Sequence, residues 1–304
     1  MIRALVTGAR GQVGTELART LAGRAEVAAH DRATLDLADT DNLVRRLREE
    51  RPALILNAAA YTAVDRAESE PEAARAVNAV APGVIADEAK SLGALLVHFS
   101  TDYVFDGTKP APYVEADTPS PVSAYGRTKL EGEQAITQSG CDHVILRTSW
   151  VYGPRGQNFL LTMLKLGATR PELRIVDDQH GAPTSSRQLA RAVVELLLGK
   201  DAEREITDAD VDRVRGHGGM YHATAQGETT WFGFAQAIFA ECARLPGRAF
   251  TAPRLVAIPT REFPTPARRP ANSRLSNDKL ERTFGVRLGE WRDGLREVVS
   301  ALPG

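Results

Sequence analysis

Short apolar runs alternate with amphipathic stretches along the first half of the chain. The runs in the middle have no polar face, which is typical of strands covered on both sides of a parallel sheet. The segments between the runs carry apolar residues at helical spacing. The predicted strands cover residues 2–7, 26–31, 53–60, 94–100 and 143–153, and the predicted helices cover 15–24, 40–52 and 70–93, with another after residue 123. Strands and helices that alternate through short connections predict a doubly wound parallel α/β sheet, a Rossmann-like fold.

The regular alternation weakens from about residue 153. We therefore expect a Rossmann-like domain at residues 1–152 and a smaller C-terminal α/β region at residues 153–304. The second region is expected to pack on the first and can contribute elements back to it. The charged stretch at residues 200–219 ends in glycines and predicts a mobile surface excursion without chemistry.

The composition is that of a globular protein, with 43% hydrophobic and 25% charged residues. Because the chain has 38 basic and 39 acidic residues, bulk attraction to nucleic acid or to an anionic membrane is not expected. Cys141 and Cys242 lack metal-ligand spacing and predict two reduced thiols. A strand-like run from Ile2 leaves no room for a signal peptide, and no apolar run reaches the length of a membrane span. We expect a cytoplasmic protein with no nucleic-acid or membrane partner.

The sequence TGARGQVG lies between the first predicted strand and its helix. Its three glycines allow a tight turn and a close approach of the backbone to a diphosphate. The free N–H groups at the start of the helix are available to the same anion. The spacing is a variant of the dinucleotide-binding fingerprint, so residues 1–152 are predicted to bind a nicotinamide dinucleotide. The predicted contacts in this turn are Gly8, Gly11, Gln12, Val13 and Gly14.

An acidic residue ends the second predicted strand, where the fingerprint places the group that binds the adenosine ribose. Asp31 would accept a hydrogen bond from that ribose and favours NADH, whereas the adjacent Arg32 could pair with the 2′-phosphate of NADPH. The sequence leaves both cofactors open. Further predicted cofactor contacts are Asp36 and Leu37 beside the adenine, and Ala58, Ala59, Ala60 and Tyr61 where the next strand ends.

Tyr125 and Lys129 lie four residues apart in SAYGRTK and so share one face of a helix. Reduction of a ketone by hydride leaves an oxyanion, which needs a proton donor. A phenol has a pKa of about 10, and we expect the cation one turn away to lower it. Thr101, in STDY, would donate a hydrogen bond to the same carbonyl oxygen. The alternative is a surface tyrosine beside a solvated lysine, but the upstream glycine turn favours a catalytic set.

Seven motifs in order support a more specific interpretation: the three glycines, NAAAYTAVDRAESEP, FSTDYVFDG, YGRTK, RTSWVYG, DQHGAPT and PTPARRPANSRL. Together they resemble the dTDP-4-dehydrorhamnose reductases of the extended short-chain dehydrogenase/reductase superfamily. The resemblance implies reduction of the 4-keto group of dTDP-4-dehydro-6-deoxy-L-mannose by NADPH or NADH. The product would be dTDP-L-rhamnose, formed in the last step of dTDP-rhamnose biosynthesis.

The resemblance also implies binding roles. Lys129 would hold the nicotinamide ribose, and residues 153–304 would mainly bind the sugar nucleotide. Asp102, Trp150 and Val64 would contact the sugar, with a core aromatic as the alternative for the tryptophan. A substrate diphosphate needs cations in a protein without bulk positive charge. The candidates, for which an exposed basic loop is the alternative, are Arg268, Arg269 and Arg274.

Some members of that family are dimers bridged by magnesium through carboxylates. Glu16 and Glu290 could contribute to such a site, but Arg187 stands where an acidic ligand would help. A cation beside a cation site argues against it. We predict no structural metal, and either a monomer or a homodimer.

Two rival functions remain. A sugar-nucleotide 4,6-dehydratase or 4-epimerase on the same fold is one, and a dehydratase needs an Asp-Glu pair after the threonine, where Asp102 is instead followed by Tyr103. The other is a non-catalytic NAD(P)-binding regulatory subunit of the same family. A binding module has no need of an intact Thr/Tyr/Lys set, so the sequence favours the reductase.

Overall fold

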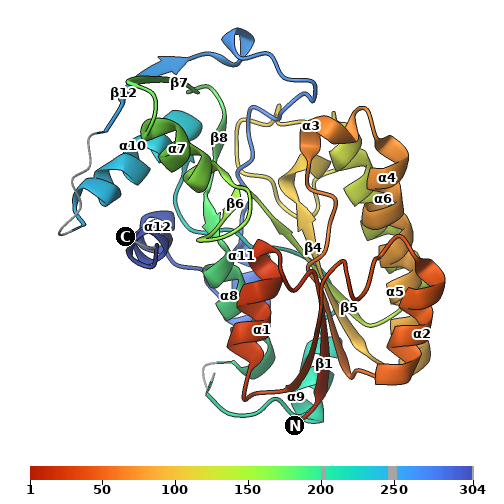
Figure 1. The fold of residues 1–304 in the computed structure, drawn as a ribbon. Coiled ribbons are helices and arrows are strands. Elements are labelled where there is room, and N and C mark those ends of the chain that lie inside the picture. The colour runs from red at the N-terminus through yellow and green to blue at the C-terminus, as the bar shows by residue number, and fades with distance from the viewer. Residues whose placement is uncertain (200–202, 246–251, 303–304) are drawn as a thin grey trace.

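The computed structural model describes residues 1–199, 203–245 and 252–302. The central strands are β1 (Arg3–Thr7), β2 (Glu26–His30), β3 (Leu54–Asn57), β4 (Leu95–Thr101), β5 (His143–Thr148) and β10 (Gly219–His222). They form a six-stranded sheet in the order β10-β5-β4-β3-β1-β2, and every neighbouring pair is parallel (Figure 1). The predicted doubly wound, Rossmann-like sheet is confirmed.

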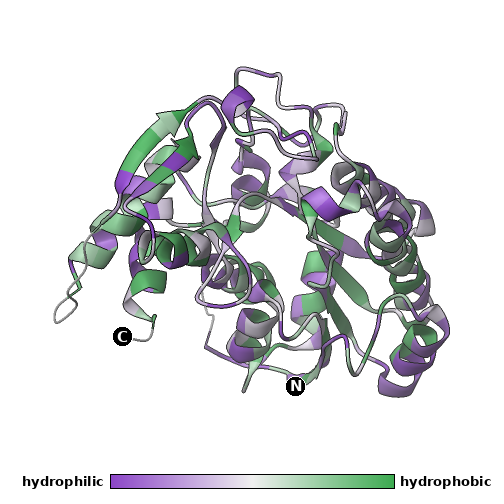
Figure 2. Cartoon of the chain, turned by 45° about the horizontal axis from the view of Figure 1, so that its top comes forward, coloured by the Kyte–Doolittle hydropathy of each residue, from purple (hydrophilic) through white to green (hydrophobic). Residues whose placement is uncertain are grey.

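Helices cover both faces of this sheet. They are α1 (Gln12–Leu21), α8 (Ser186–Leu198) and α9 (Asp208–Arg215) on one face, and α2 (Thr40–Glu50), α5 (Ala81–Leu92) and α6 (Ala124–Ser139) on the other. Successive side chains of a strand point to opposite faces. Accordingly Leu54 and Leu56 of β3 pack with α1 and α8, while Ile55 packs with α2 and α5. Figure 2 shows hydrophobic strands at the centre and polar residues on the outer faces of the helices.

Shorter elements surround the ends of the central strands. After β3 the chain forms α3 (Val64–Ala67) and α4 (Pro71–Arg75), and a π-helical turn at Ala76–Val80 runs on into α5. A 3₁₀ turn (Asp102–Val104) follows β4 directly. Another 3₁₀ turn (Thr260–Glu262) and α11 (Asp278–Phe284) lie in the C-terminal part. No helix in the described ranges has both the length and the apolar character needed to cross a membrane.

The second half of the chain has a hydrophobic cluster of its own. It is built around α7 (Phe159–Gly167), α10 (Trp231–Ala243) and α12 (Trp291–Ser300), with β7 (Glu172–Val176) parallel to β12 (Arg254–Ile258). Two further pairs are β6 (Val151–Tyr152) with β9 (Thr184–Ser185) and β8 (His180–Gly181) with β11 (Thr229–Thr230). The same half also supplies β10 to the central sheet and α8 to its face (Figure 1).

The prediction of a surface excursion at residues 200–219 is wrong for the described residues 203–219; residues 200–202 lie outside the described ranges. This segment contains α9 and the first residue of β10. Val211 and Val214 share one face of α9 and are buried against the core, while Asp210 accepts hydrogen bonds from the backbone N–H and hydroxyl of Thr207. The prediction overlooked the three-residue spacing of Val211 and Val214 among the charged residues, which is enough to bury one face of a short helix.

Candidate active site

The glycine turn follows β1 and leads into α1. Gly8 has a φ of +69°, and a Cβ atom there would lie 2.9 Å from the backbone of Ala59. A Cβ on Gly14 would lie 2.2 Å from the carbonyl oxygen of Gly8. Gly11 caps α1 without a side-chain hydrogen bond, so the first N–H groups of the helix, at Gln12 and Val13, have no side-chain cap. A turn that only glycine fits, beside free helix N–H groups, suits a dinucleotide diphosphate.

Asp31 lies directly after β2, where the ribose of such a dinucleotide would lie. Its Oδ1 accepts from the N–H groups of Ala33 and Thr34, and its Oδ2 is 2.6 Å from Nε of Arg10. Burial opposes the carboxylate, but the Thr34 hydrogen bonds and the Arg10 charge outweigh it and lower the pKa of Asp31. Arg10 was missed by the sequence reasoning, although it stands inside the glycine turn. Arg32 is exposed and pairs with Asp36 at 3.3 Å.

Of the other predicted cofactor residues, only those at 58–61 lie directly after a strand, β3. Leu37 is buried in the hydrophobic cluster that α2 forms against the sheet, and Ala58, Ala59 and Ala60 follow β3 and are partly exposed. Tyr61 is tied down, because its hydroxyl donates to Glu70 at 2.6 Å and its backbone N–H donates to Asn78. The small residues therefore allow the glycine turn to pack closely against the carboxyl end of β3.

Tyr125 and Lys129 lie on one face of α6, as the spacing predicted. Lys129 is 1% exposed, and its Nζ donates to the Phe99 carbonyl oxygen at 2.7 Å and lies 3.0 Å from Nε2 of His98. The Tyr125 ring is partly exposed and packs against Ala67, Ala74 and Ala124. The helix thus aims a phenol and an ammonium toward the ends of β3 and β4.

The expected effect of Lys129 on the phenol is wrong for the protein alone. Burial, reinforced by the nearby Asp102 charge and opposed by a hydrogen bond with Thr101, raises the pKa of Tyr125 to about 12. Burial also lowers the pKa of Lys129 to about 8, against the opposing charge of Glu133. Both groups are desolvated, and the ammonium is directed to the Phe99 carbonyl and His98, so it does not stabilise the phenolate.

Thr101 and Asp102 join the same site at the end of β4. The Thr101 hydroxyl donates to Oδ1 of Asp102 at 3.1 Å and also takes part in the hydrogen bond with Tyr125. Asp102 is 2% exposed, and its Oδ2 has no hydrogen-bond partner among the described residues. Burial raises the pKa of Asp102 to about 6, although bonds from Ser273 and Thr101 lower it. The carboxyl is therefore poised beside the phenol with one oxygen unused.

The raised pKa of Asp102 predicts how the free energy of unfolding depends on pH. An acid whose pKa rises from 3.8 to about 6 on folding binds more protons when folded, so its burial costs free energy above pH 6 but not near pH 4. Asp102→Asn should therefore raise the free energy of unfolding by up to about 3 kcal/mol at neutral pH and by little near pH 4. Urea unfolding at both pH values measures this. The exposed Asp87→Asn serves as the control, and an equal gain at both pH values would contradict the prediction.

Trp150 lies where the chain leaves β5. Its φ is +48°, a conformation that non-glycine residues adopt rarely, so the surrounding structure must hold the backbone at this position. The indole stacks on Trp231 at 3.6 Å between centroids, and Trp231 donates from Nε1 to Gln179. A Cβ on Gly181 would lie 2.6 Å from the Trp150 ring. The partly exposed indole is thus braced from behind by a second tryptophan that the sequence reasoning did not select.

The three candidate arginines have different surroundings. Arg269 pairs with Asp65, the residue after Val64 on α3, at 3.0 Å, and it hydrogen-bonds Tyr103, whose ring meets Tyr125 edge-on at 5.5 Å. Arg274 is bonded to Asn272 and Glu228. Arg268 is exposed and makes no ion pair with any residue in the described ranges. Arg269 therefore lies beside Tyr103 in the site, Arg274 is occupied by a carboxylate, and Arg268 is unpaired within the described ranges.

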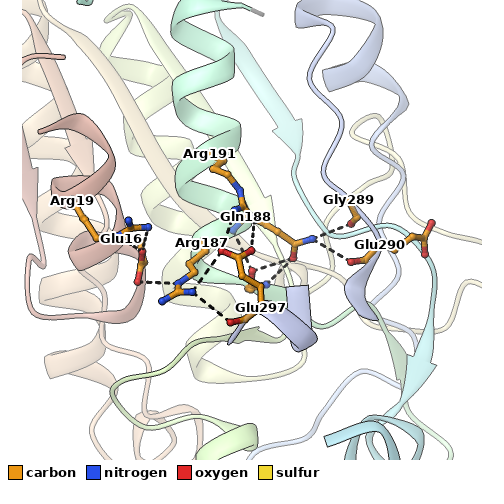
Figure 3. A network of polar contacts seen from close by, with 9 residues as sticks. Glu16, Arg19, Arg187, Gln188, Arg191, Gly289, Glu290 and Glu297 are labelled. Carbon is orange, nitrogen blue, oxygen red and sulfur yellow. Dashed lines mark hydrogen bonds and ion pairs between the residues drawn. The ribbon is translucent and has the colours of Figure 1, made fainter. Parts of the chain in front are cut away.

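The possible metal ligands are arranged differently from expectation. Arg187 lies 3.7 Å from Glu16 and 3.5 Å from Glu297, and Arg191 pairs with Glu297 at 2.7 Å (Figure 3). The Glu290 carboxylate points away from this network, and only its backbone carbonyl accepts from Gln188. The acidic partner of Glu16 across Arg187 is thus Glu297 and not Glu290. The network joins α1 to α8 and α12.

The fold and site together define an NAD(P)-dependent oxidoreductase of the extended short-chain dehydrogenase/reductase class. A glycine turn after β1 is one half of the site, and a Thr/Tyr/Lys set at the end of β4 and the start of α6 is the other. The family model described as "RmlD substrate binding domain" matches residues 2–303, and the chain belongs to this family. The predicted resemblance is confirmed.

Relatives extend this result. A dTDP-4-dehydrorhamnose reductase of Burkholderia thailandensis is 48% identical over 96% of this chain and 96% of the relative. The protein of that name from Escherichia coli K12 is 41% identical over 98% of this chain and 97% of the relative. Among solved structures, the dTDP-4-dehydrorhamnose reductase of Clostridium acetobutylicum has a TM-score of 0.88, 38% identity and coverage of 98% and 99%. That of Bacillus anthracis, in complex with NADP, has a TM-score of 0.86, 32% identity and 98% coverage of both chains.

Proposed function

We propose that this protein reduces the 4-keto group of dTDP-4-dehydro-6-deoxy-L-mannose to give dTDP-L-rhamnose, with NADPH or NADH as the reductant. The observation that carries the proposal is the Tyr125 hydroxyl, protonated and hydrogen-bonded to Thr101, beside a glycine turn in a chain of this family. Relatives that match over nearly their whole length bear the name of that reductase. The enzyme is proposed to work as a monomer or a homodimer.

The bound dinucleotide would supply a hydride to C4 of the sugar, and its diphosphate would rest on the turn at Gly8, Gly11 and Gly14. Tyr125 donates its hydroxyl proton to the carbonyl oxygen, so the ketone becomes an alcohol and the phenol becomes a phenolate. Because burial raises the pKa of Tyr125 to about 12, the phenol holds its proton until the oxyanion begins to form. Thr101 steadies the same oxygen by a hydrogen bond.

Lys129 has two roles in this proposal. It would hold the nicotinamide ribose with the N–H that the protein leaves free. Through the ribose hydroxyls it would pass the proton that restores the phenol after each turnover, and the resulting amine would regain a proton from solvent when the site opens to release product. Burial lowers the pKa of Lys129 to about 8, so the loss of its proton is accessible near neutral pH. The buried ammonium would therefore serve as a proton reserve one helical turn from the phenol.

Substrate contacts follow from the same geometry. The indole of Trp150 offers a flat apolar face to the sugar, and Asp102 and Val64 border it. Arg268, which has no ion-pair partner among the described residues, carries a guanidinium that could bind a diphosphate. Arg269 orients Tyr103 and α3 through its bonds to Asp65 and the Tyr103 hydroxyl.

The test of the function is a spectrophotometric assay of reduced-nicotinamide consumption. Oxidation of NADPH with dTDP-4-dehydro-6-deoxy-L-mannose, and not with dTDP-4-dehydro-6-deoxy-D-glucose, is the expected result. Conversion of the second compound without net oxidation would indicate an epimerase. Binding of the dinucleotide with no turnover of either compound would indicate a regulatory subunit, and either outcome would overturn the proposal.

The choice of dinucleotide is proposed to depend on Arg10 and Arg32, which flank Asp31. Arg10 lies against the Asp31 carboxylate, and its side chain is 85% exposed, so it can turn to a 2′-phosphate. Arg10→Ala should lower kcat/KM with NADPH by about 10-fold or more and change the value with NADH by less than about twofold. Arg32→Ala measures the contribution of the second arginine separately. Arg45→Ala, on α2, is the control. An equal loss with both dinucleotides would remove the phosphate role.

We also propose that the protein needs no structural metal. Arg187 provides positive charge between Glu16 and Glu297, where a divalent cation would otherwise neutralise them. EDTA should therefore leave the Tm unchanged, and added magnesium should not raise it, whereas Arg187→Ala should lower the Tm. Thermal unfolding with and without chelator measures this. A drop of several degrees with EDTA in the unmodified protein would show that a metal is bound.

A further inference from the structure

A buried chain of polar side chains runs from the glycine turn to Lys129. The Thr7 hydroxyl is 2.7 Å from Oδ1 of Asn57, Nδ2 of Asn57 is 3.0 Å from Nδ1 of His98, and Nε2 of His98 is 3.0 Å from Nζ of Lys129. The four side chains come from β1, β3, β4 and α6, and none is more than 1% exposed. Polar groups are placed so deep in a sheet only when each has a hydrogen-bond partner.

His98 is neutral in this chain. Burial, with the neighbouring charges of Lys129 and His143, lowers the pKa of His98 well below its usual value. A neutral imidazole carries a single N–H, so one ring nitrogen donates and the other accepts. Because both ring nitrogens have partners, the direction of every hydrogen bond in the chain depends on which nitrogen carries that proton.

Two directions are possible for the hydrogen bonds between Asn57 and Lys129, and Thr7 donates to Asn57 in one and accepts from it in the other. In the one drawn in the structure, Thr7 donates to Asn57, Asn57 donates to Nδ1 of His98, and the N–H on Nε2 points at Lys129. This direction requires a neutral amine, because an ammonium has no lone pair. In the other direction, the Asn57 amide is turned over, His98 donates from Nδ1 to Asn57, and Nε2 accepts from an ammonium.

The amine state favours the direction drawn in the structure. An aliphatic amine is a much stronger base than imidazole, with a reference pKa of about 10.4 against about 6.5, so the better hydrogen bond runs from the imidazole N–H to the amine lone pair. In either state Lys129 also donates to the Phe99 carbonyl oxygen. The ammonium then keeps one N–H for a ligand in the site. Thr7 is buried at the far end, so the chain does not lead a proton to solvent.

Other charged groups around Lys129 are already paired. Glu133, one turn further along α6, is held by Arg147 of β5 and by Ser100 of β4. The remaining titratable groups near the chain are Tyr125 on α6, Asp102 after β4 and His143 on β5. His98 is therefore the neutral partner that can change its donor direction without creating or burying a new charge.

We propose that His98 is a positioning residue for Lys129, and that the Thr7–Asn57–His98 chain reverses its hydrogen-bond direction when Lys129 changes between ammonium and amine. The proposal rests on the proposed reductase function for its catalytic consequence. Its physical content concerns only residues of this chain. Such a chain lets Lys129 release and regain a proton while its Nζ atom stays in one place, which the restoration of Tyr125 requires.

The direct test is ¹⁵N NMR of histidine-labelled protein without ligand, titrated from about pH 6 to pH 10. His98, assigned with His98→Gln, should be a neutral Nδ1–H tautomer at the acid end and a neutral Nε2–H tautomer at the alkaline end. The midpoint should lie near the pKa of Lys129, which is about 8. In Lys129→Met the change should be absent. A single tautomer over the whole range, or an imidazolium at neutral pH, would overturn the proposal.

Kinetics give an independent readout. His98→Leu removes a hydrogen-bond acceptor of the Lys129 ammonium. Because a hydrogen bond to a charged group is stronger than one to the amine, this loss should lower the pKa of Lys129. The alkaline limb of kcat/KM should therefore move to lower pH by about one unit. His98→Gln, whose amide can donate or accept, should restore most of the limb. His222→Leu, at another fully buried histidine in the same sheet, should leave the limb in place. An unmoved limb in His98→Leu would contradict the positioning role.

The two proposals fail in different ways. If the unmodified protein reduces no 4-keto sugar, the proposed function is wrong, and the NMR titration still decides the behaviour of the chain. If Lys129→Met loses activity while His98→Leu keeps the wild-type pH profile and dinucleotide Kd, the function stands and the role of His98 is wrong. Since the tautomer change itself is measured in the unmodified protein, poor folding of Lys129→Met or His98→Leu leaves that measurement intact.

Discussion

Tyr125→Phe is expected to lower kcat by about 10³-fold while changing the Kd of the dinucleotide by less than about twofold. The substitution removes the one proton that the developing oxyanion would receive and leaves the ring in its place against Ala67, Ala74 and Ala124. The pKa of about 12 strengthens the case, because at neutral pH nearly every Tyr125 hydroxyl carries its proton. Stopped-flow and steady-state measurements of NADPH oxidation give kcat, and fluorescence titration gives the Kd.

A matched control for this variant is Tyr221→Phe. Tyr221 is a buried tyrosine on β10 whose hydroxyl donates to the backbone of His217, outside the site. It should lose some stability and keep kcat within about twofold. Wild-type kcat in Tyr125→Phe would show that another group gives the proton, and the buried carboxyl of Asp102 would be the first candidate. A large rise in dinucleotide Kd would show that the hydroxyl binds cofactor more than it protonates substrate.

Arg147→Met is expected to reduce the free energy of unfolding by about 3–5 kcal/mol. Arg147 on β5 and Glu133 on α6 are each 2% exposed and are joined by two hydrogen bonds of 2.9 and 2.6 Å. The guanidinium also lies 5.0 Å from the centre of the Phe105 ring. Removing the cation leaves the Glu133 carboxylate buried with only the Ser100 hydroxyl and the more distant Lys129 to stabilise it. Urea unfolding measures the loss.

The double variant Glu133→Gln/Arg147→Met should recover much of that loss, because it removes the stranded charge together with its partner. Arg296→Met is the surface control: Arg296 pairs with Asp293 at 3.0 Å, but both side chains are more than half exposed. That variant should cost less than about 1 kcal/mol. A similar cost for Arg147→Met and Arg296→Met would mean that the buried pair contributes no more than an exposed one.

The sheet could be predicted because the burial of each strand is visible in its own sequence of apolar residues. All positions of β3 and β4 are buried, so each appears in the sequence as a mainly apolar run, and the glycine turn fixes where the first strand ends. The face shared by Tyr125 and Lys129 was predictable for the same reason, since helical spacing is local. The charged stretch that forms α9 was misread because its two buried valines are outnumbered by polar residues.

The electrostatics of the site could not be predicted from the motifs. The pKa of Tyr125 depends on burial and on Asp102, and the direction of the Lys129 side chain depends on His98, which the sequence presents as one polar residue in an apolar run. Contacts distant in sequence were equally invisible. Asp65 and Arg269 are 204 residues apart, and the pairing of Arg187 with Glu297 in place of Glu290 depends on how α12 packs on α8.

The edge strand β10 comes from the part of the chain that also contains α10 and α12, so the two halves are interleaved. A recombination event that exchanged everything after residue 153 would also replace one strand of the nucleotide-binding sheet. A truncation there would uncover the backbone edge of β5, a template for pairing with another chain. New sugar specificity in this protein must therefore arise by changes in side chains and loops, because its halves are not exchangeable modules.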